Sequence, residues 1–142
     1  MANPRNTVAF DDIGIVTATF IYDNSDITYS ATVAGGSSAV GFAVTTTGET
    51  GAVIALAGDG ERVTGKLLKV EADGKCTVQV GGFCKLPGGT SATLTAGLKI
   101  VGDLGGVSTT DRGYIQAVAT QHTVSRGEII DSTTTTAVVV RL

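Results

Sequence analysis

The sequence predicts an all-β protein: a small sandwich or barrel-like β domain with an extended N-terminal arm. Three observations lead to this fold class. Threonine and valine are frequent, and their β-branched side chains suit a pleated strand. The chain holds 20 glycines in 142 residues, which favours many turns and disfavours long helices. Short β-type runs recur roughly every ten residues, and no helical apolar period is sustained for three turns.

Length and composition limit the organisation and the partners. We expect an arm at residues 1–10 and a single β-rich domain at residues 11–142. With 42% hydrophobic and 16% charged residues, the chain should fold. A net charge of −3 gives no basic footprint, so nucleic acid is not an expected partner. No run is long enough to span a bilayer, and Met1–Asp12 does not resemble a signal peptide. We therefore expect no membrane partner and synthesis in a cytoplasm.

The first strand is expected at Ile13–Tyr22, where β-forming side chains occupy both faces. Asp23–Asp26 supplies turn residues, so Ile27–Val33 is the expected hairpin partner. Further strands are predicted at Ser38–Thr46, Ala52–Ala57 and Val63–Val70, with glycine-containing turns between them.

The clearest local signal is the pair Asp73-Gly74, which lies between two alternating runs. Such a pair accepts the positive φ angles of a tight hairpin. The outgoing strand should turn Cys76, Val78 and Val80 to a dry face and Thr77 and Gln79 to a wetter one.

In the second half, Gly81-Gly82 should interrupt the chain before a strand at Phe83–Leu86, which Pro87 ends. A short helical turn is possible around Thr90–Ala96. The later strands are expected at Leu98–Val101, Gly113–Thr120, Gly127–Asp131 and Ala137–Leu142. The last of these is apolar nearly throughout, which predicts burial between neighbouring strands. No internal repeat is visible in the sequence.

Few residues could support catalysis. His122 is the single histidine, and the sequence lacks a Gly-x-Ser-x-Gly elbow, so His122 is interpreted as an exposed loop residue. The spacing of Cys76 and Cys84 fits neither a redox pair nor a zinc site. We expect buried or half-buried thiols, with a disulfide as the alternative. The sequence therefore predicts no enzyme, and it nominates no catalytic, cofactor-binding or metal-ligating residue.

Several polar groups have an alternative interpretation. Asp11-Asp12 and Asp23–Asp26 could gather oxygen ligands for calcium, but their spacing is not that of an EF-hand, and turn capping is favoured. Carboxylates that could meet in a glycosidase-like pair are Glu49, Glu61, Glu71 and Glu128. Against such a sugar cleft, tryptophan is absent and aromatic residues make up only 5% of the chain.

Two segments could contact other chains. The polar arm, which includes Ala2–Thr7, is either a disordered tail or a segment that orders against a neighbouring subunit. Thr133–Thr136 is either a solvated hairpin crossing or a polar edge that pairs with another chain by strand addition.

The second half of the chain carries a series of short segments in a characteristic order: Gly82–Pro87, Ala92–Gly97, Leu98–Val101, Gly127–Ile130 and Val138–Leu142. In these segments the chain resembles small capsid decoration (cement) proteins of tailed bacteriophages, and the resemblance spans roughly residues 65–142. One segment departs from the family pattern: Gly102–Gly106 replaces an aromatic-led hairpin, which leaves the local strand order open.

This resemblance implies a structural virion protein. Such a protein would bind the outer surface of an icosahedral head as a homotrimer at three-fold and quasi-three-fold positions. It would stabilise neighbouring subunits of the major capsid protein and would be assembled in the host cytoplasm. The alternatives are a head fibre, tail-tube or spike component, a small β-barrel ligand-binding domain or enzyme, and a sugar-binding adhesin.

Overall fold

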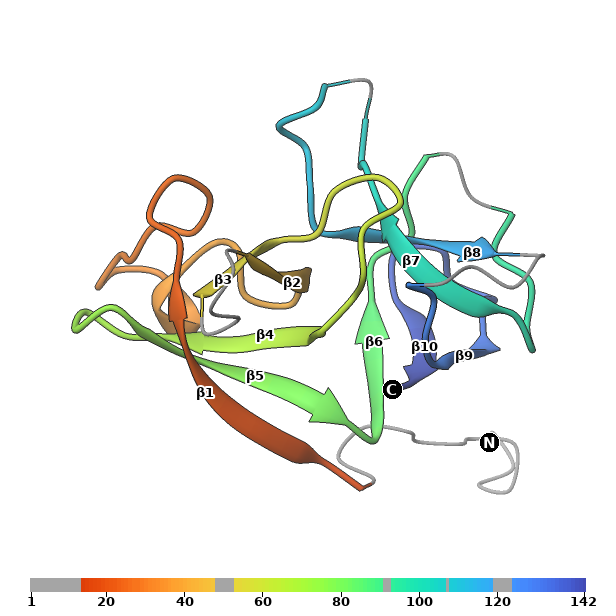
Figure 1. The fold of residues 1–142 in the computed structure, drawn as a ribbon, viewed down its shortest axis with the longest axis horizontal. Helices are drawn as coiled ribbons and strands as arrows, with labels where there is room; N and C mark the ends of the chain where they lie inside the picture. The colour runs from red at the N-terminus through yellow and green to blue at the C-terminus, as the bar shows by residue number, and fades with distance from the viewer. Residues whose placement is uncertain (1–13, 48–52, 91–92, 107, 119–123) are drawn as a thin grey trace, which may run out of the picture.

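The computed structural model describes residues 14–47, 53–90, 93–106, 108–118 and 124–142, and it confirms the all-β class. Within these residues the chain forms ten strands and one short 3-10 helix at Ala34–Gly36. Figure 1 shows β1 to β5 on one side of the molecule and β6 to β10 on the other. The strands are β1 (Val16–Tyr22), β2 (Ala43–Thr47), β3 (Val53–Leu56), β4 (Gly65–Val70), β5 (Lys75–Gly81), β6 (Phe83–Leu86), β7 (Lys99–Asp103), β8 (Tyr114–Val118), β9 (Glu128–Asp131) and β10 (Val138–Arg141).

The first five strands close into a barrel in the order β1-β3-β2-β4-β5. β1 pairs with β5 antiparallel along most of its length and with β3 parallel at Ile21 and Tyr22, which closes the ring. Closure of this kind removes the unpaired backbone groups that an open sheet exposes at its edges.

The last five strands form a three-stranded sheet, β6-β10-β9, and a two-stranded sheet, β7-β8. Backbone hydrogen bonds join the two sheets on both sides. Ile100 and Arg126 exchange amide-to-carbonyl bonds of 3.0 and 3.1 Å, which link β7 to the start of β9. Gly88 and Ile115 form a parallel bridge that links the end of β6 to β8. These bonds complete a second ring of five strands.

Each ring has its own apolar core. The core of the first ring holds Tyr22, Ile27, Ala39, Val44, Ile54, Leu67, Val70, Cys76 and Val78. The core of the second ring holds Cys84, Leu86, Ile100, Ile115, Ile129, Val138 and Val140, together with Ala43, Ala57 and Val63 from the first half of the chain. Because those three side chains belong to the second core, the two rings are packed directly on one another.

Backbone and side-chain hydrogen bonds reinforce this junction. The amide of Ala43 donates to the carbonyl of Gly113, and the amide of Gly113 donates to the carbonyl of Ala57, each over 2.7 Å. The guanidinium of Arg126 donates to the carbonyls of Thr64 (2.8 Å) and Val80 (3.0 Å), which both belong to the first ring.

Several local predictions are confirmed. Gly74 adopts a φ of 89° in the β4–β5 hairpin, as the Asp-Gly pair predicts. Gly82, with a φ of 85°, separates β5 from β6. β10 lies between β6 and β9 and is buried along Val138–Val140, so the prediction for the C-terminal strand holds.

Three local predictions are wrong. Ile27–Val33 forms no strand: the amide of Ile27 bonds to the carbonyl of Asp23, and the amide of Ser30 bonds to the carbonyl of Gly36, so the backbone folds on itself. The described part of Thr90–Ala96 contains no helical turn. Gln79 lies on no wet face, because it is only 3% exposed and its amide donates to the carbonyls of Gly81 and Phe83.

Candidate docking surface

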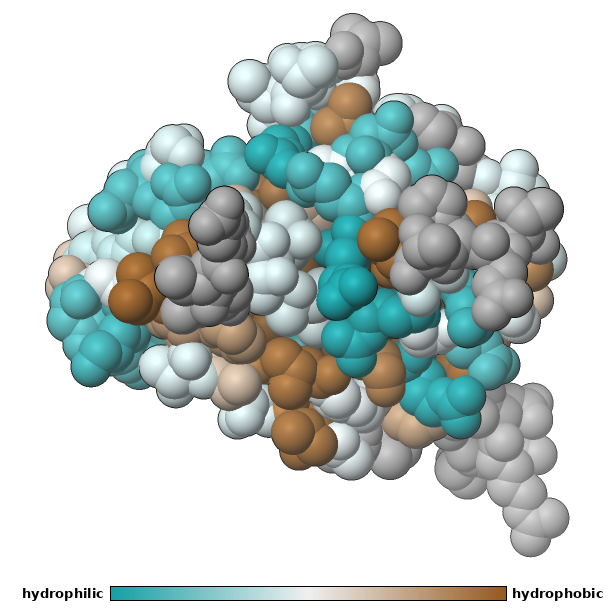
Figure 2. Space-filling model, in the orientation of Figure 1, coloured by the Kyte–Doolittle hydropathy of each residue, from teal (hydrophilic) through white to brown (hydrophobic). Residues whose placement is uncertain are grey.

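Exposed apolar side chains gather along β1. Val16 is 56% exposed and Ile21 is 53% exposed, and Ile15 just before the strand is also exposed. We call these three residues the β1 strip. Figure 2 shows hydrophobic surface along the lower edge, where Figure 1 places β1. Val16–Ile21 pairs with β5, and Ile21 also pairs with β3, so the backbone of the strand is held on both sides at Ile21 and on one side at Val16.

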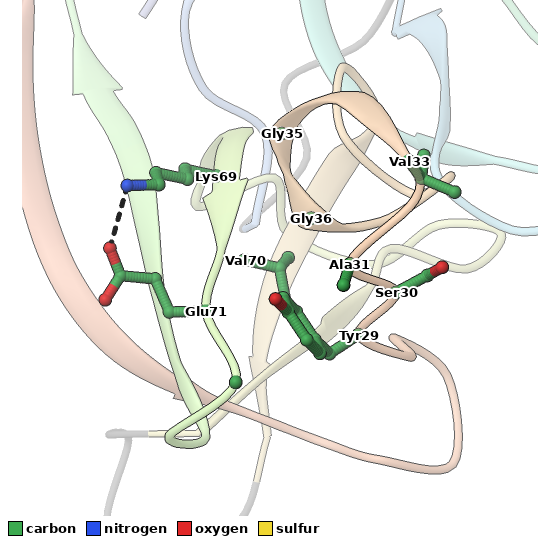
Figure 3. Close-up of a pocket in the computed structure, with 10 residues that line it drawn as sticks. Tyr29, Ser30, Ala31, Val33, Gly35, Gly36, Lys69, Val70 and Glu71 are labelled. Carbon is green, nitrogen blue, oxygen red and sulfur yellow. Dashed lines mark ion pairs between the residues drawn. The ribbon is translucent and has the colours of Figure 1, made fainter.

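A second apolar feature lies on the connector between β1 and β2. Tyr29 and Val33 are each 38% exposed, and they line a cavity of about 340 Å³ with the end of β4. In Figure 3 the connector faces the segment that carries Lys69 and Glu71, whose side chains form an ion pair of 3.0 Å. We call this feature the connector pocket.

The connector is held tightly against β4 by Gly36. Its φ of +89° favours glycine, and a Cβ atom at this position would overlap the carbonyl oxygen of Val70. No other residue type allows this close approach of the two backbones. The wall of the connector pocket is therefore fixed by backbone packing.

A cluster of half-buried and exposed ion pairs joins the two rings beside a further cavity of about 330 Å³. The Arg112 guanidinium lies 2.6 Å from a carboxylate oxygen of Glu61 and 3.6 Å from one of Asp26. Glu61 also accepts a hydrogen bond from the backbone amide of Gly58, and Asp26 accepts one from the backbone amide of Leu56. Both acids are therefore already used within the chain, and the cluster has a structural role.

The turn-capping interpretation of Asp23 is confirmed. Its carboxylate accepts bonds from the backbone amide of Ser25 at 2.9 Å and from the Ser25 hydroxyl at 2.8 Å. These bonds stabilise the charged form, so they lower the pKa of Asp23.

The two cysteines are buried free thiols, as the first interpretation predicts. Cys76 belongs to the core of the first ring and Cys84 to that of the second. Burial raises the pKa of the Cys76 thiol to about 11, so this thiol stays protonated at neutral pH.

The glutamates of the proposed carboxylate pair are not brought together where the structure describes them. Glu61 and Glu71 lie at opposite ends of β4, and Glu128 begins β9 in the other ring. Their cationic partners also differ: Arg112, Lys69 and Arg141 respectively. Glu49, His122, Asp11-Asp12 and the arm lie outside the described residues.

Thr133–Thr136 forms the exposed turn between β9 and β10, in agreement with the solvated-crossing interpretation. It is not a strand edge.

The exposure of Tyr29 and Val33 was not predicted, since both residues fall in a segment whose sequence locally predicts a strand with one buried face. The β-type composition of Ile27–Val33 carries no signal for a folded-back connector.

Within the described ranges, no group of three or more metal-ligating side chains comes together. The described residues also contain no helix long and apolar enough to cross a membrane. Comparisons of the chain with protein-family models, with curated proteins and with solved structures find no match.

Proposed function

We propose that this chain is a capsid decoration protein, which binds the outer surface of an icosahedral phage head and stabilises neighbouring major capsid subunits. The observation that carries the proposal is the β1 strip: Val16 and Ile21, two large apolar side chains, are more than half exposed on a strand of a closed barrel. Exposed apolar patches on a folded domain mark interaction sites. The sequence resemblance over roughly residues 65–142 supports the same class of partner.

The physical role is mechanical. A cement protein must bring a firm surface to two subunits at once and resist their separation. The ladder with β5 supplies that rigidity along Val16–Ile21, and the pairing with β3 adds to it at Ile21, so these two side chains cannot move without breaking ladder hydrogen bonds. We assign the β1 strip to contact with the major capsid protein. The protein acts as a homotrimer in this proposal, at three-fold and quasi-three-fold positions of the virion.

The proposal is tested by co-sedimentation of the purified protein with capsids of the same virus from which the protein has been removed. Ile21→Asp places a charge on the exposed strip without disturbing a core side chain, so we expect a loss of capsid binding of at least tenfold. Thr134→Asp, on the exposed β9–β10 turn, is the matched control and should bind as the unaltered protein does. If Ile21→Asp binds as well as Thr134→Asp does, the strip is not the capsid contact.

Light scattering coupled to size exclusion tests the assembly state. A mass near three chains supports the homotrimer. A head fibre, tail-tube or spike component would instead form long or open-ended assemblies, which the same measurement would reveal. If the unaltered protein fails to bind capsids at any concentration tested, the decoration role itself is wrong.

A further inference from the structure

The two rings of this chain have the same strand order. In the first ring β1 is parallel to β3, β3 pairs with β2, β2 with β4, β4 with β5, and β5 with β1. In the second ring the end of β6 is parallel to β8, β8 pairs with β7, β7 meets the start of β9, β9 pairs with β10, and β10 with β6. Each strand of the first ring therefore has a counterpart five strands later.

The register also agrees, including an irregularity. In the β4–β5 ladder Leu67 pairs with Val78, and the next pair is Lys69 with Thr77, so Leu68 is skipped. In the β9–β10 ladder Ile129 pairs with Val140, and the next pair is Asp131 with Val139, so Ile130 is skipped. The same bulge occurs at the same place in both ladders. A β-bulge is a specific local feature that closure of a five-stranded ring does not by itself require.

The contact between the second and fourth strands repeats bond for bond. Gly41 donates to the carbonyl of Leu67, and the Leu67 amide donates to the carbonyl of Phe42. In the second ring Gly97 donates to the carbonyl of Ile129, and the Ile129 amide donates to the carbonyl of Leu98.

The parallel contact repeats as well. The amide of Asp23, just after β1, donates to the carbonyl of Ile54 over 2.8 Å. The amide of Gly89, just after β6, donates to the carbonyl of Ile115 over the same distance. Ile54 and Ile115 are both fully buried, each in the core of its own ring.

Glycines recur at two equivalent positions. Gly41 and Gly97 have φ angles of 98° and 90°, and each donates the first of the two hydrogen bonds in the contact between the second and fourth strands. A Cβ atom at Gly65 would overlap the carbonyl oxygen of Gln79, and one at Gly127 would lie 2.6 Å from that of Arg141. The ladders place Gln79 and Arg141 at equivalent positions, because each lies one residue beyond the matched valine of its strand.

We infer that this chain is a tandem duplication of one five-stranded barrel, with repeats that correspond to β1–β5 and β6–β10. The inference goes beyond the proposed function and does not depend on it. Equivalent core positions keep their apolar character while their identities change. The equivalent buried pairs are Val44 and Ile100, Ile54 and Ile115, Leu67 and Ile129, Cys76 and Val138, and Val78 and Val140.

A comparison of the two repeats shows which residues occur in only one of them. Asp23 is equivalent to Gly89, and Gly41 to Gly97, so the connector at 24–40 corresponds to the connector at 90–96. The first connector holds seventeen residues and the second holds seven. The longer first connector includes the folded-back segment with Tyr29 and Val33, and all residues that line the connector pocket belong to the first repeat.

An exchange of connectors tests the inference. One variant replaces residues 90–96 with a copy of 24–40, so that both repeats carry the long connector. A control replaces 90–96 with seventeen glycine and serine residues. Nuclear magnetic resonance would follow amide exchange at Gly41, Leu67, Gly97 and Ile129, and thermal unfolding would rank the variants.

If the repeats are equivalent, the long-connector variant keeps slow exchange at all four amides. It should also melt above the glycine–serine control, because the borrowed segment can place an apolar side chain over the second core, as Ile27 does over the first. Loss of slow exchange in the second ring of the long-connector variant, or melting no higher than that of the control, would overturn the duplication. Capsid binding is not part of this readout, so a failure of the proposed function would remain distinguishable.

Discussion

Arg126→Ala should destabilise the protein through the junction between the two rings. The guanidinium of Arg126 donates to the carbonyls of Thr64 and Val80 at 2.8 and 3.0 Å. Burial, with a smaller contribution from the charge of Arg62, lowers the pKa of Arg126, although the group remains protonated. Removal of the side chain leaves both carbonyl groups without these donors at a site that is partly buried.

The magnitude follows from these two bonds. A hydrogen bond from a charged donor contributes about 1.5–3 kcal/mol, and partial access of water to the freed carbonyls reduces the cost. We therefore expect a loss of about 2–4 kcal/mol in the free energy of unfolding. For a chain of this length, that loss lowers the melting temperature by roughly 10 °C. Urea unfolding followed by circular dichroism measures the free energy directly.

Arg141→Ala is the matched control, because Arg141 forms an exposed ion pair with Glu128 at 3.1 Å. Exposed pairs contribute about 0–1 kcal/mol, so this variant should unfold nearly as the unaltered protein does. Arg126→Lys retains the charge but loses the planar fork that reaches two carbonyls, and it should fall between the two variants. Equal stabilities of Arg126→Ala and Arg141→Ala would refute the reasoning.

Three further predictions concern the two cores and the repeated glycine. Leu67→Ala and Ile129→Ala should each cost about 2–5 kcal/mol in urea unfolding, because both side chains are fully buried at equivalent positions; a loss below 1 kcal/mol at either would contradict the packing. Gly127→Ala should lower the melting temperature measurably, since its φ of +64° disfavours a side chain and the Cβ meets the Arg141 carbonyl; unchanged melting would show that the backbone relaxes freely. Because the folded pKa of Cys76 is raised to about 11, its contribution of about 3 kcal/mol is present below roughly pH 8.5 and is lost as the pH rises toward 11. Unfolding measured from pH 8 to 11 should show this loss in the unaltered protein and a smaller one in Cys76→Val, and equal slopes would refute the assignment.

Local signals in the sequence were enough to predict most of the strands. Asp73-Gly74 predicts the β4–β5 hairpin because a two-residue turn of this type depends only on nearby backbone angles. The burial of β10 is also visible locally, since an apolar run of that length fits a strand with neighbours on both sides.

The predictions that failed depend on distant partners. Gln79 follows the alternating pattern of a half-exposed strand, but it is buried where the second ring meets the first and bonds to the carbonyl of Phe83. The connector with Tyr29 has the composition of a strand, yet β3 pairs with β1 at Ile21 and Tyr22, the end where a hairpin partner would begin. In both cases tertiary contacts override a local preference.

The repeat was invisible in the sequence for a physical reason. Equivalent positions in the two repeats share backbone geometry and burial but not side-chain identity. Val44 in the first ring corresponds to Ile100 in the second, and Cys76 corresponds to Val138. The few shared residues include glycines, which are common throughout this chain and therefore carry little information by themselves. The connectors also differ in length, so no single spacing aligns the two halves.

Barrel closure also determines how the first ring can bind a partner. A chain that adds a strand to a sheet needs unpaired amides and carbonyls at an edge. Each strand of the first ring has a paired neighbour on both sides, although β1 meets β3 only at Ile21 and Tyr22, and Thr133–Thr136, the segment considered for strand addition, forms a turn in the second ring. We therefore expect contact with the first ring to rely mainly on side chains that point outward from its strands, and Val16 and Ile21 of the β1 strip are the large apolar side chains exposed there. Ile21→Asp should accordingly weaken capsid binding far more than substitutions in Thr133–Thr136 do. The capsid-binding test therefore also tests this argument from the topology of the barrel.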